Sequence, residues 1–339
     1  MPVEPLISVC IVTGRRNGML DEALRCLQDQ LDSPTFEVLV CADADPTVEA
    51  TVRARFPDAT VVHVPKTLPS AGRNHLLGIA RGELLYFLDD DILFGPRLLA
   101  RLAELAEAHP DCGVYGGPND TPRRSSRFQR VQGAVLASLV ASGPVRRRYG
   151  RHPEGRADER WFILCNLAVR RTVMRRFDEE LVCAEENALL SELHAVGVTM
   201  HYDPELSVFH ERRSDLRGFV QQMHKYGRGR GQVIRRDGIH THPAFLLPAG
   251  LVAYLAVAPL LWLLVGPIAL VPAGGYVAVV LGGAAKVASS MKRATDAPLA
   301  ALLIVVVHGC YGTGVIRGLL RKPRRRTPRR TAPAELSSR

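Results

Sequence analysis

Three consecutive carboxylates, Asp89, Asp90 and Asp91, follow an uninterrupted apolar run over residues 84–88. A run without a polar face is typical of a strand that is buried on both sides of a parallel sheet. The carboxylates then lie at the carboxyl edge of the sheet, where ligands bind in such folds. Crowded carboxylates raise one another's pKa unless a positive charge compensates them. A divalent cation that prefers oxygen ligands, Mg2+ or Mn2+, supplies that charge and also bridges to phosphate oxygens.

The same aspartates have a simpler interpretation as the acidic start of the helix that Gly95 and Pro96 open. Carboxylates favour the first turn of a helix, because the helix dipole is positive there. One aspartate would serve that purpose, whereas three directly behind a buried strand favour a metal site. We therefore predict metal binding and keep the helix start as the alternative.

The elements that position these carboxylates alternate between apolar, strand-like runs and segments with helical spacing. Strands are predicted at residues 6–13, 36–42, 60–64, 84–89, 113–115 and 161–169, and helices at 19–31, 70–79 and 96–109. Short loops join them, which predicts an α/β fold with a mostly parallel sheet. The loop after the first strand has neither G-x-G-x-x-G nor a P-loop lysine, which excludes an ordinary dehydrogenase and an ATPase.

Several segments, in their order along the chain, resemble glycosyltransferase family 2 and its GT-A fold. They are the strand 9–13 that ends in Thr, the strand 37–43 that ends in Asp, the Ala-Gly-Arg-Asn helix 71–82 and the three aspartates. The resemblance covers residues 6–235 and depends on the set, since each piece alone is weak. It implies a nucleotide-sugar-binding, Rossmann-like domain that transfers a sugar with inversion. Ala42 stands where the family often has a second Asp.

The resemblance also implies which residues bind the donor. Those near its nucleoside or ribose would be Thr13, Arg15, Asp43, Asp89 and Asp90. Arg73 would face the diphosphate or the sugar, because its planar guanidinium suits phosphate oxygens. Asp91, together with Asp89, would ligate the metal. Arg73 could instead be an ordinary surface residue of a helix, but its place beside Asn74 in the motif favours binding.

Two further carboxylates, Glu185 and Glu186, stand at the start of a predicted helix, shortly after Phe177-Asp-Glu. In the family the second acid of the corresponding pair is the catalytic base, which implies Glu186 here, with Glu185 as the rival. A carboxylate at a helix start is kept ionised by the dipole, as a base must be. The alternative is a plain acidic first turn of a helix that packs through its leucines.

Basic residues end the region of resemblance. His210 begins a His-x-x-Arg pattern that recurs in polysaccharide-type members, which implies a further metal ligand, although a lone histidine is more often structural. Residues 226–230, Tyr-Gly-Arg-Gly-Arg, resemble bacterial exopolysaccharide glycosyltransferases of the succinoglycan type. Arg228 and Arg230 would then clamp the diphosphate of the donor or of a lipid acceptor. A basic collar under a membrane is the alternative.

The C-terminal third differs in composition from the rest. Three apolar stretches follow one another at residues 245–265, 266–285 and 298–320. The first two are long enough to span a bilayer, and the basic residues Lys286, Lys292 and Arg293 predict that they form a hairpin that returns to the cytosol. The third is predicted either to cross or to lie at the interface. A buried hairpin in a soluble protein is disfavoured, because these stretches are apolar all round.

The distribution of charge and the cysteine content indicate the binding partners and the cellular compartment of the protein. Of the net charge of +10, seven positive charges lie in residues 321–330, and a basic block behind apolar stretches favours membrane lipid over nucleic acid as its partner. The seven cysteines form no C-x-x-C pair, which disfavours a disulfide framework or a zinc site and suits a reducing compartment. The first residues lack signal-peptide features, so we expect a cytoplasmic catalytic domain at the inner (plasma) membrane.

The sequence therefore predicts a membrane-bound, metal-dependent, inverting glycosyltransferase of cell-surface polysaccharide synthesis. The donor would be a UDP- or GDP-sugar, and the acceptor a polyprenyl-linked saccharide or a glycan. The predicted division is a GT-A catalytic domain at 1–210, a basic interfacial segment at 211–243, transmembrane helices at 244–320 and a disordered basic tail at 321–339. The alternatives are a sugar nucleotidyltransferase, which needs a Gly-rich first loop and a lysine, and a non-enzymatic membrane scaffold.

Overall fold

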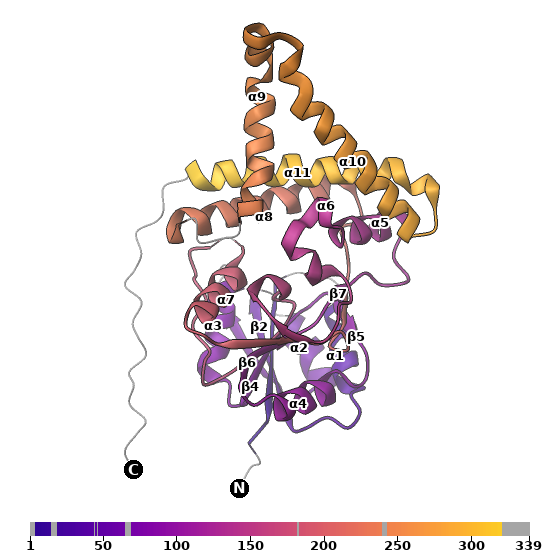
Figure 1. Cartoon of the computed structure of the whole chain (residues 1–339). Coiled ribbons are helices and arrows are strands. Elements are labelled where there is room, and N and C mark those ends of the chain that lie inside the picture. The colour runs from indigo at the N-terminus through magenta and orange to yellow at the C-terminus, as the bar shows by residue number, and fades with distance from the viewer. Residues whose placement is uncertain are drawn as a thin grey trace.

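The structure is a computed structural model of the chain. It describes residues 4–14, 19–43, 45, 47–64, 69–181, 183–238 and 243–320. An α/β domain forms the lower part of the molecule, and a set of helices from the middle and the C-terminal third of the chain lies above it (Figure 1).

An eight-stranded sheet forms the centre of the α/β domain, with the strand order β3-β2-β1-β4-β9-β6-β10-β8. The strands are β1 (Ile7–Thr13), β2 (Phe36–Asp43), β3 (Thr60–Val64), β4 (Leu84–Asp89), β6 (Cys112–Gly116), β8 (Gly155–Ala157), β9 (Asn166–Arg170) and β10 (Thr199–Tyr202). Strands β3, β2, β1 and β4 run parallel, as do β6 and β10, whereas β9 and β8 are antiparallel to their neighbours. The predicted mostly parallel α/β sheet is confirmed.

Helices cover both faces of this sheet, which explains the continuous apolar run of β4. They are α1 (Met19–Gln28), α2 (Thr47–Arg55), α3 (Pro69–Ile79), α4 (Leu98–Ala108) and α7 (Glu185–Ala195). Leu84, Tyr86 and Leu88 pack with α1, α2 and α4 on one face, while Leu85 and Phe87 pack with α3 and α7 on the other. Because side chains of a strand alternate between faces, burial on both faces requires apolar residues at every position.

A small second sheet lies beside the end of β4 and brings distant residues to it. Its strands are β5 (Ile92–Phe94), β11 (Val208–His210) and β7 (Asn119–Asp120), in the order β5-β11-β7. The pairing of β11 with β5 is antiparallel and sets His210 opposite Ile92. His210 therefore lies next to the aspartates that end β4.

The strand predicted over residues 161–169 is wrong in its first half. A 3-10 helix occupies Glu159–Trp161, and β9 begins only at Asn166. Phe162 and Cys165 are nevertheless fully buried. The apolar run shows that these residues are buried, but both a strand and an irregular segment can be buried. The sequence pattern alone therefore did not distinguish a strand from irregular backbone here.

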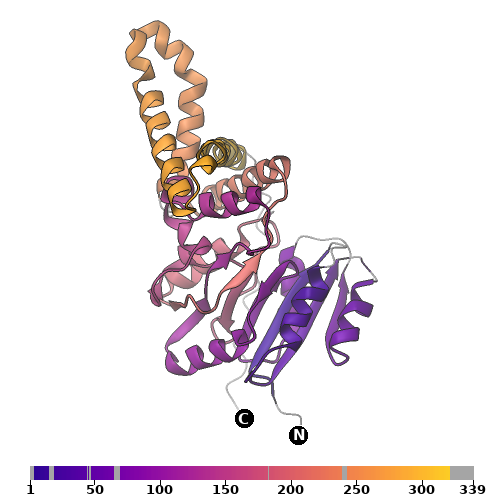
Figure 2. The same ribbon diagram turned by 90° about the vertical axis from the view of Figure 1, so that its right-hand side faces the viewer.

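The helical part consists of a helical hairpin that projects from the domain and of further helices that pack at the base of the hairpin. Its elements are α5 (Arg127–Leu136), α6 (Leu139–Ser142), η1 (Gly143–Tyr149), α8 (Leu216–Asp237), α9 (Leu247–Val265), α10 (Val271–Ser290) and α11 (Ala297–Leu320). Helices α9 and α10 form a hairpin that points away from the sheet, and α11 lies across the base of the hairpin and along α8 (Figures 1 and 2). The amphipathic helix α5 packs on α8, α10 and α11.

Two helical stretches in the described residues have the length and apolar composition of membrane-spanning segments. Pro243–Ser290, which contains the α9–α10 hairpin, has 48 residues, and Ala294–Leu320 has 27. The most apolar window of the first is 0% buried, whereas that of the second is 39% buried. The third apolar stretch, which the sequence allowed either to cross or to lie flat, thus lies across the hairpin base and packs on α8.

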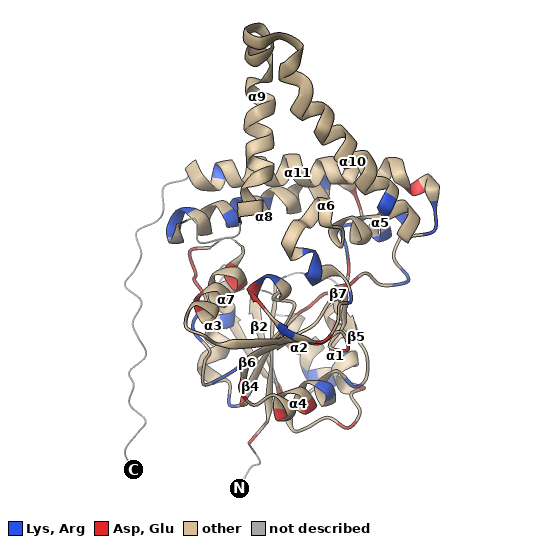
Figure 3. Ribbon diagram, in the orientation of Figure 1, with Lys and Arg blue, Asp and Glu red and all other residues tan. Residues whose placement is uncertain are grey.

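Charged residues are distributed unevenly along this part of the chain. The hairpin carries no Lys, Arg, Asp or Glu between Phe245 and Ala285, and Lys and Arg gather at the level of α5, α8 and the α10–α11 connection (Figure 3). Leucines and valines of the hairpin are exposed, among them Leu263 at 80% and Leu264 at 70%. Exposed apolar surface of this extent is typical of an interaction with lipid or with another protein.

Glycines allow α8 and α11 to lie against each other. They are spaced four apart on both helices, at Gly227 and Gly231 on α8 and at Gly314 and Gly318 on α11. A Cβ atom at any of these positions would overlap a backbone carbonyl oxygen of the facing helix. Small residues at this spacing allow close helix packing in apolar surroundings. Part of the Tyr-Gly-Arg-Gly-Arg pattern therefore serves packing.

Candidate active site

The three predicted metal ligands come together at the carboxyl edge of the sheet. One ligand atom from each of Asp89, Asp91 and His210 lies within 4.8 Å of those of the other two. The closest pair is His210 Nε2 and Asp91 Oδ1, at 2.9 Å. The chain places them by the sharp turn after β4 and by the pairing of β11 with β5.

The donor set fits Mn2+ or Mg2+, which take carboxylate oxygens, and Mn2+ also accepts imidazole. His210 can serve as a ligand only if Nε2 carries a lone pair, which requires the proton on Nδ1. The Asn119 amide lies 3.3 Å from Nδ1, and its Oδ1 is buried without a partner among the described residues. Reversing this amide would let Oδ1 accept from Nδ1–H, the support that a metal-bound histidine needs.

Arg73 connects the aspartates to the second carboxylate pair. Its guanidinium lies 2.9 Å from Glu185 Oε1 and 3.3 Å from Asp89 Oδ1, and the residue is only 8% exposed. Burial raises the pKa of Asp89, and the charge of Arg73 opposes that rise. The sequence prediction that Arg73 is more than a surface residue agrees with this burial, and its charge faces the cavity where a diphosphate would lie.

The remaining donor-binding candidates have different positions. Thr13 is buried at the end of β1 and donates to Asp90 Oδ2 at 2.5 Å, so the hydroxyl positions an aspartate. Asp43 ends β2, and its side chain lies outside the described part of the chain. Arg15 also lies outside the described residues.

Asn74, beside Arg73 in the motif, holds the segment that precedes Glu185 and Glu186. Its Oδ1 accepts from the backbone N–H of Phe177 at 2.9 Å, and its Nδ2 donates to the Phe177 carbonyl at 2.9 Å and to Glu179 Oε1 at 2.7 Å. The amide is buried. It therefore pins residues 177–179, from which the chain continues towards Glu185.

Replacing Asn74 by alanine is expected to destabilise the protein by about 2–3 kcal/mol, because two backbone groups of Phe177 lose their buried partner. The replacement of its exposed neighbour, His75→Ala, should change stability by less than about 0.5 kcal/mol and serves as the control. Thermal or denaturant unfolding of the two variants tests this. Equal stability of both would show that the amide does not hold the segment.

Glu185 and Glu186 form the first turn of α7. Ala184 precedes them with φ 68°, a left-handed conformation that turns the chain sharply into the helix. Glu185 pairs with Arg73, whereas Glu186 Oε1 accepts from Asn187 Nδ2 at 2.8 Å and lies 3.6 Å from Arg148 Nη1. Burial and the neighbouring Glu185 raise the pKa of Glu186, and Arg148 opposes them. Glu186 is thus the more suitable of the two for accepting a proton.

The structure places Arg148, which the sequence analysis did not select, beside Glu186. Of the predicted pair Arg228 and Arg230, only Arg230 lines the cavity described below. Arg148 of η1 and Arg230 of α8 are 5% and 7% exposed, and both donate to Asn187 Oδ1 at 2.8 Å. Nothing marked Arg148 among the many arginines of residues 123–160, since only the fold brings η1 to α7.

One cavity connects the metal-ligand cluster, Arg73, the two glutamates and the two buried arginines. It has a volume of about 920 Å³ and is lined by Arg73, the three aspartates, Glu185, Glu186, His210, Arg148 and Arg230. Its walls continue to residues of α6, α9, α10 and α11, including Leu251, Val279 and Val307. The carboxylates at the sheet edge therefore share one space with the helices at the base of the apolar hairpin.

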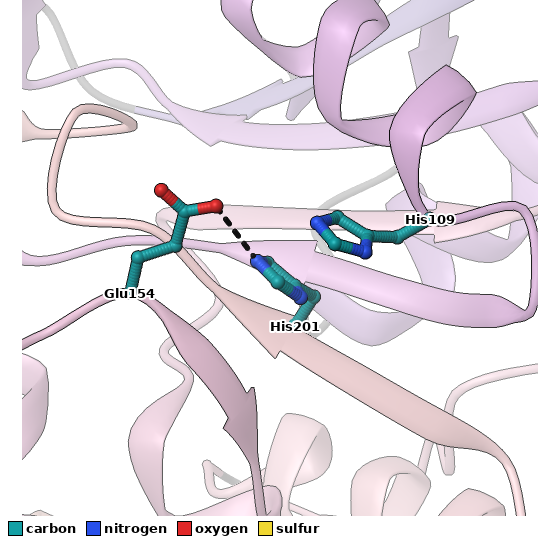
Figure 4. Close-up of side chains that lie close together, drawn as sticks. All are labelled: His109, Glu154 and His201. Atoms are coloured by element: carbon teal, nitrogen blue, oxygen red, sulfur yellow. Dashed lines mark hydrogen bonds and ion pairs between the residues drawn. The ribbon is translucent and has the colours of Figure 1, made fainter.

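A second group of potential metal ligands lies apart from this cavity. His109, Glu154 and His201 come close together where α4 ends and β10 begins (Figure 4). The imidazole rings stack 4.0 Å apart, Glu154 lies 3.2 Å from His201 Nε2, and Arg101 pairs with Glu154 at 3.1 Å. Burial lowers the pKa of His201. Because Arg101 already supplies a positive charge, we assign this cluster to packing between α4, β8 and β10.

A mostly parallel sheet with acidic residues at its carboxyl edge and a second carboxylate pair beside them is typical of a GT-A-type transferase fold. The model of the family "Glycosyl transferase family 2" matches residues 8–181, about half of the chain, and the chain belongs to this family. It is therefore a glycosyltransferase, and inversion at the transferred sugar is general for the family.

Similar proteins extend beyond the matched segment. The succinoglycan biosynthesis protein ExoM of Rhizobium meliloti is 29% identical over 259 residues, which cover 69% of this chain and 77% of that protein. The mannosyltransferase PcManGT of Pyrobaculum calidifontis, solved with GDP-Man and Mn2+, has a TM-score of 0.58 at 18% identity and covers 94% of this chain and 88% of its own. TarS 1–349 of S. aureus with UDP has a TM-score of 0.51 at 17% identity, covering 91% and 90%.

Proposed function

We propose that the protein is a membrane-bound, metal-dependent, inverting glycosyltransferase that transfers a sugar from a nucleotide donor to a lipid-linked acceptor in cell-surface polysaccharide synthesis. The observation that carries this proposal is the single cavity, which runs from Asp91 and Glu186 to the base of the α9–α10 hairpin. A soluble acceptor would not need walls made from membrane-type helices. The relationship to a succinoglycan biosynthesis protein supports the same class of product.

The donor side of the site is formed by Asp89, Asp91, His210 and Arg73. A Mg2+ or Mn2+ ion held by the first three would offset the negative charge of the leaving nucleoside diphosphate. Arg73 would bind the diphosphate with two N–H donors, in addition to its ion pairs with Asp89 and Glu185. The complexes of the similar proteins, with GDP-Man and Mn2+ or with UDP, support a UDP- or GDP-sugar as the donor.

The acceptor side of the site contains the base. Glu186 accepts the proton of the acceptor hydroxyl as its oxygen attacks the anomeric carbon from the face opposite the leaving group. Asn187 holds the carboxylate in place by a 2.8 Å hydrogen bond. Arg73 fixes Glu185 at 2.9 Å, which keeps the rival carboxylate turned towards the donor.

We place the α9–α10 hairpin in the inner membrane with the α/β domain on the cytoplasmic side. The 19 residues of α9 rise about 28 Å, close to the hydrocarbon thickness of a bilayer. The basic residues around the hairpin base suit the anionic cytoplasmic surface. We keep the division into residues 1–210, 211–243, 244–320 and 321–339, although the last lies outside the described residues.

A donor screen on purified membranes tests the proposal. Membranes that contain the wild-type protein should release nucleoside diphosphate from one UDP- or GDP-sugar when Mn2+ or Mg2+ and lipid extract are present. Asp91→Asn should lower this release at least about 100-fold, because the cation loses a ligand. The exposed Asp58→Asn removes the same charge elsewhere and should match the wild type. Release that is unaffected by Asp91→Asn or by chelation would overturn the proposed metal site.

A further inference from the structure

The cavity changes character between the sheet edge and the hairpin. Near the sheet it is lined by the charged residues of the donor side and by Glu186. Near the hairpin its walls are mainly apolar, with Tyr276 and His308 bonded to each other among Leu139, Val140, Leu247, Leu251, Val279 and Val307. A molecule that fills both parts must carry a polar group at one end and a hydrocarbon group at the other.

Two arginines connect these two parts. Arg230 places its guanidinium 4.1 Å from the ring of Phe245, at the start of the hairpin, and also donates to Asn187 Oδ1. Arg148 donates to the same oxygen and reaches Glu186 at 3.6 Å. Asn187 in turn donates to Glu186. Arg148 is thus in direct contact with the base, and Arg230 is connected to it through Asn187 and lies beside the start of the hairpin.

Two buried guanidinium groups meet at one neutral acceptor, Asn187 Oδ1, and Arg148 also donates to the backbone carbonyls of Arg160 and Glu159. Desolvation and mutual repulsion make a buried pair of like charges costly unless an anion joins them. Burial lowers the pKa of Arg148, Glu186 opposes this effect, and Arg230 lowers the pKa to a smaller extent. The single negative charge of Glu186 faces two positive charges here, and Glu186 becomes neutral whenever it takes a proton. A phosphate group, with several oxygens and two negative charges, would compensate both arginines.

We infer that Arg148 and Arg230 bind the phosphate or diphosphate group of a prenyl-type lipid acceptor, with its chain along the apolar wall. This inference rests on the proposed function and specifies the acceptor. The donor's diphosphate has a different partner, since Arg73 and the metal ligands lie on the Glu185 side of the same helical turn. Arg73 therefore binds the donor, whereas Arg148 and Arg230 bind the acceptor.

Direct binding to the full-length protein in detergent tests the inference. The probe is farnesyl diphosphate; farnesol reports the chain alone, and inorganic pyrophosphate the head group alone. The wild type should bind farnesyl diphosphate at least about tenfold more tightly than either part. Arg148→Gln and Arg230→Gln should each weaken it by about tenfold to a hundredfold, because each removes charge-assisted hydrogen bonds. Arg217→Gln, an exposed change on α8, is the control and should bind as the wild type does.

Binding of nucleoside diphosphate with Mn2+, measured on the same variants, separates donor from acceptor. It should stay within about twofold of the wild type in both arginine variants. Weakened nucleotide binding with unchanged farnesyl diphosphate binding would assign the pair to the donor and overturn the inference. So would a wild type that binds farnesol as tightly as farnesyl diphosphate.

Failure of the proposed function has a different signature: a wild type that binds the prenyl diphosphate but releases no nucleoside diphosphate from any donor. Thermal unfolding checks that the variants are folded. If a Gln variant does not fold, Arg148→Lys and Arg230→Lys keep the charge but lose the planar fork. They should then show weakened binding of farnesyl diphosphate with intact nucleotide binding, and unchanged binding of both ligands would again contradict the inference.

Discussion

Replacing Glu186 by glutamine is expected to lower sugar transfer by about 100- to 10,000-fold while donor binding is retained. Glutamine has the shape of the glutamate side chain and keeps a carbonyl oxygen for the bond from Asn187, which measures 2.8 Å in the wild type. It cannot take up the proton of the acceptor hydroxyl. The loss should therefore appear in kcat, measured as product formation at saturating donor.

The pH profile provides a second measure of the same residue. Burial and the neighbouring Glu185 raise the pKa of Glu186 above its ordinary value of 4.5, and Arg148 opposes this rise. A base must be unprotonated, so wild-type kcat should fall as the pH is lowered through this raised pKa. The decline should begin at a higher pH than for an exposed glutamate, and the residual activity of Glu186→Gln should lack it.

Glu185→Gln is the matched control for Glu186→Gln, since the two residues are adjacent on α7. Glu185 holds Arg73 at 2.9 Å, so its loss should change donor KM and leave the acid limb of kcat in place. A Glu186→Gln variant with near-normal transfer, or an acid limb that disappears only in Glu185→Gln, would transfer the role of base to Glu185.

The parts of the site that the sequence predicted are those that depend on the residue pattern of a single strand or helix. Residues 84–88 are apolar at each position because β4 is buried on both faces. The sequence therefore predicted both the strand and the aspartates that follow it. Glu185 and Glu186 open a helix, as expected from acids ahead of leucines. His210 joins the aspartates through strand pairing, a long-range contact that only the family pattern suggested.

The parts that the sequence did not predict depend on the fold. Arg148 is one of several arginines in a basic region, and its role follows from the position of η1 beside α7. Asn166, at the start of β9, is fully buried and forms hydrogen bonds with Tyr86 and Leu206, a long-range arrangement that only the fold creates. Gly227 of Tyr-Gly-Arg-Gly-Arg has no periodic signal of its own, because only the fold brings it against the backbone of Tyr311 on α11.

The glycines of the facing helix α11 give the second large expected effect. Gly318→Leu should destabilise the protein by about 3 kcal/mol or more, because a Cβ atom at this position already overlaps the carbonyl oxygen of Arg228 on α8. Backbone atoms cannot rotate aside as a side chain can, so α8 and α11 would have to separate. Thermal unfolding in detergent should show the loss, and Gly318→Ala should show a smaller one.

Gly309→Leu introduces the same side chain on the same helix and is the control, since nothing lies within 4 Å of a Cβ atom there. It should unfold close to the wild type. Separation of α8 from α11 also moves Arg230 away from Val307, so the residual folded Gly318→Leu should lose acceptor-dependent transfer more than nucleotide binding. Nucleotide binding persists because the metal ligands belong to the α/β domain, where β4, β5 and β11 hold them independently of α11. A Gly318→Leu protein as stable as Gly309→Leu would mean that the two helices do not touch at this point, and that the upper wall of the cavity is not built as described.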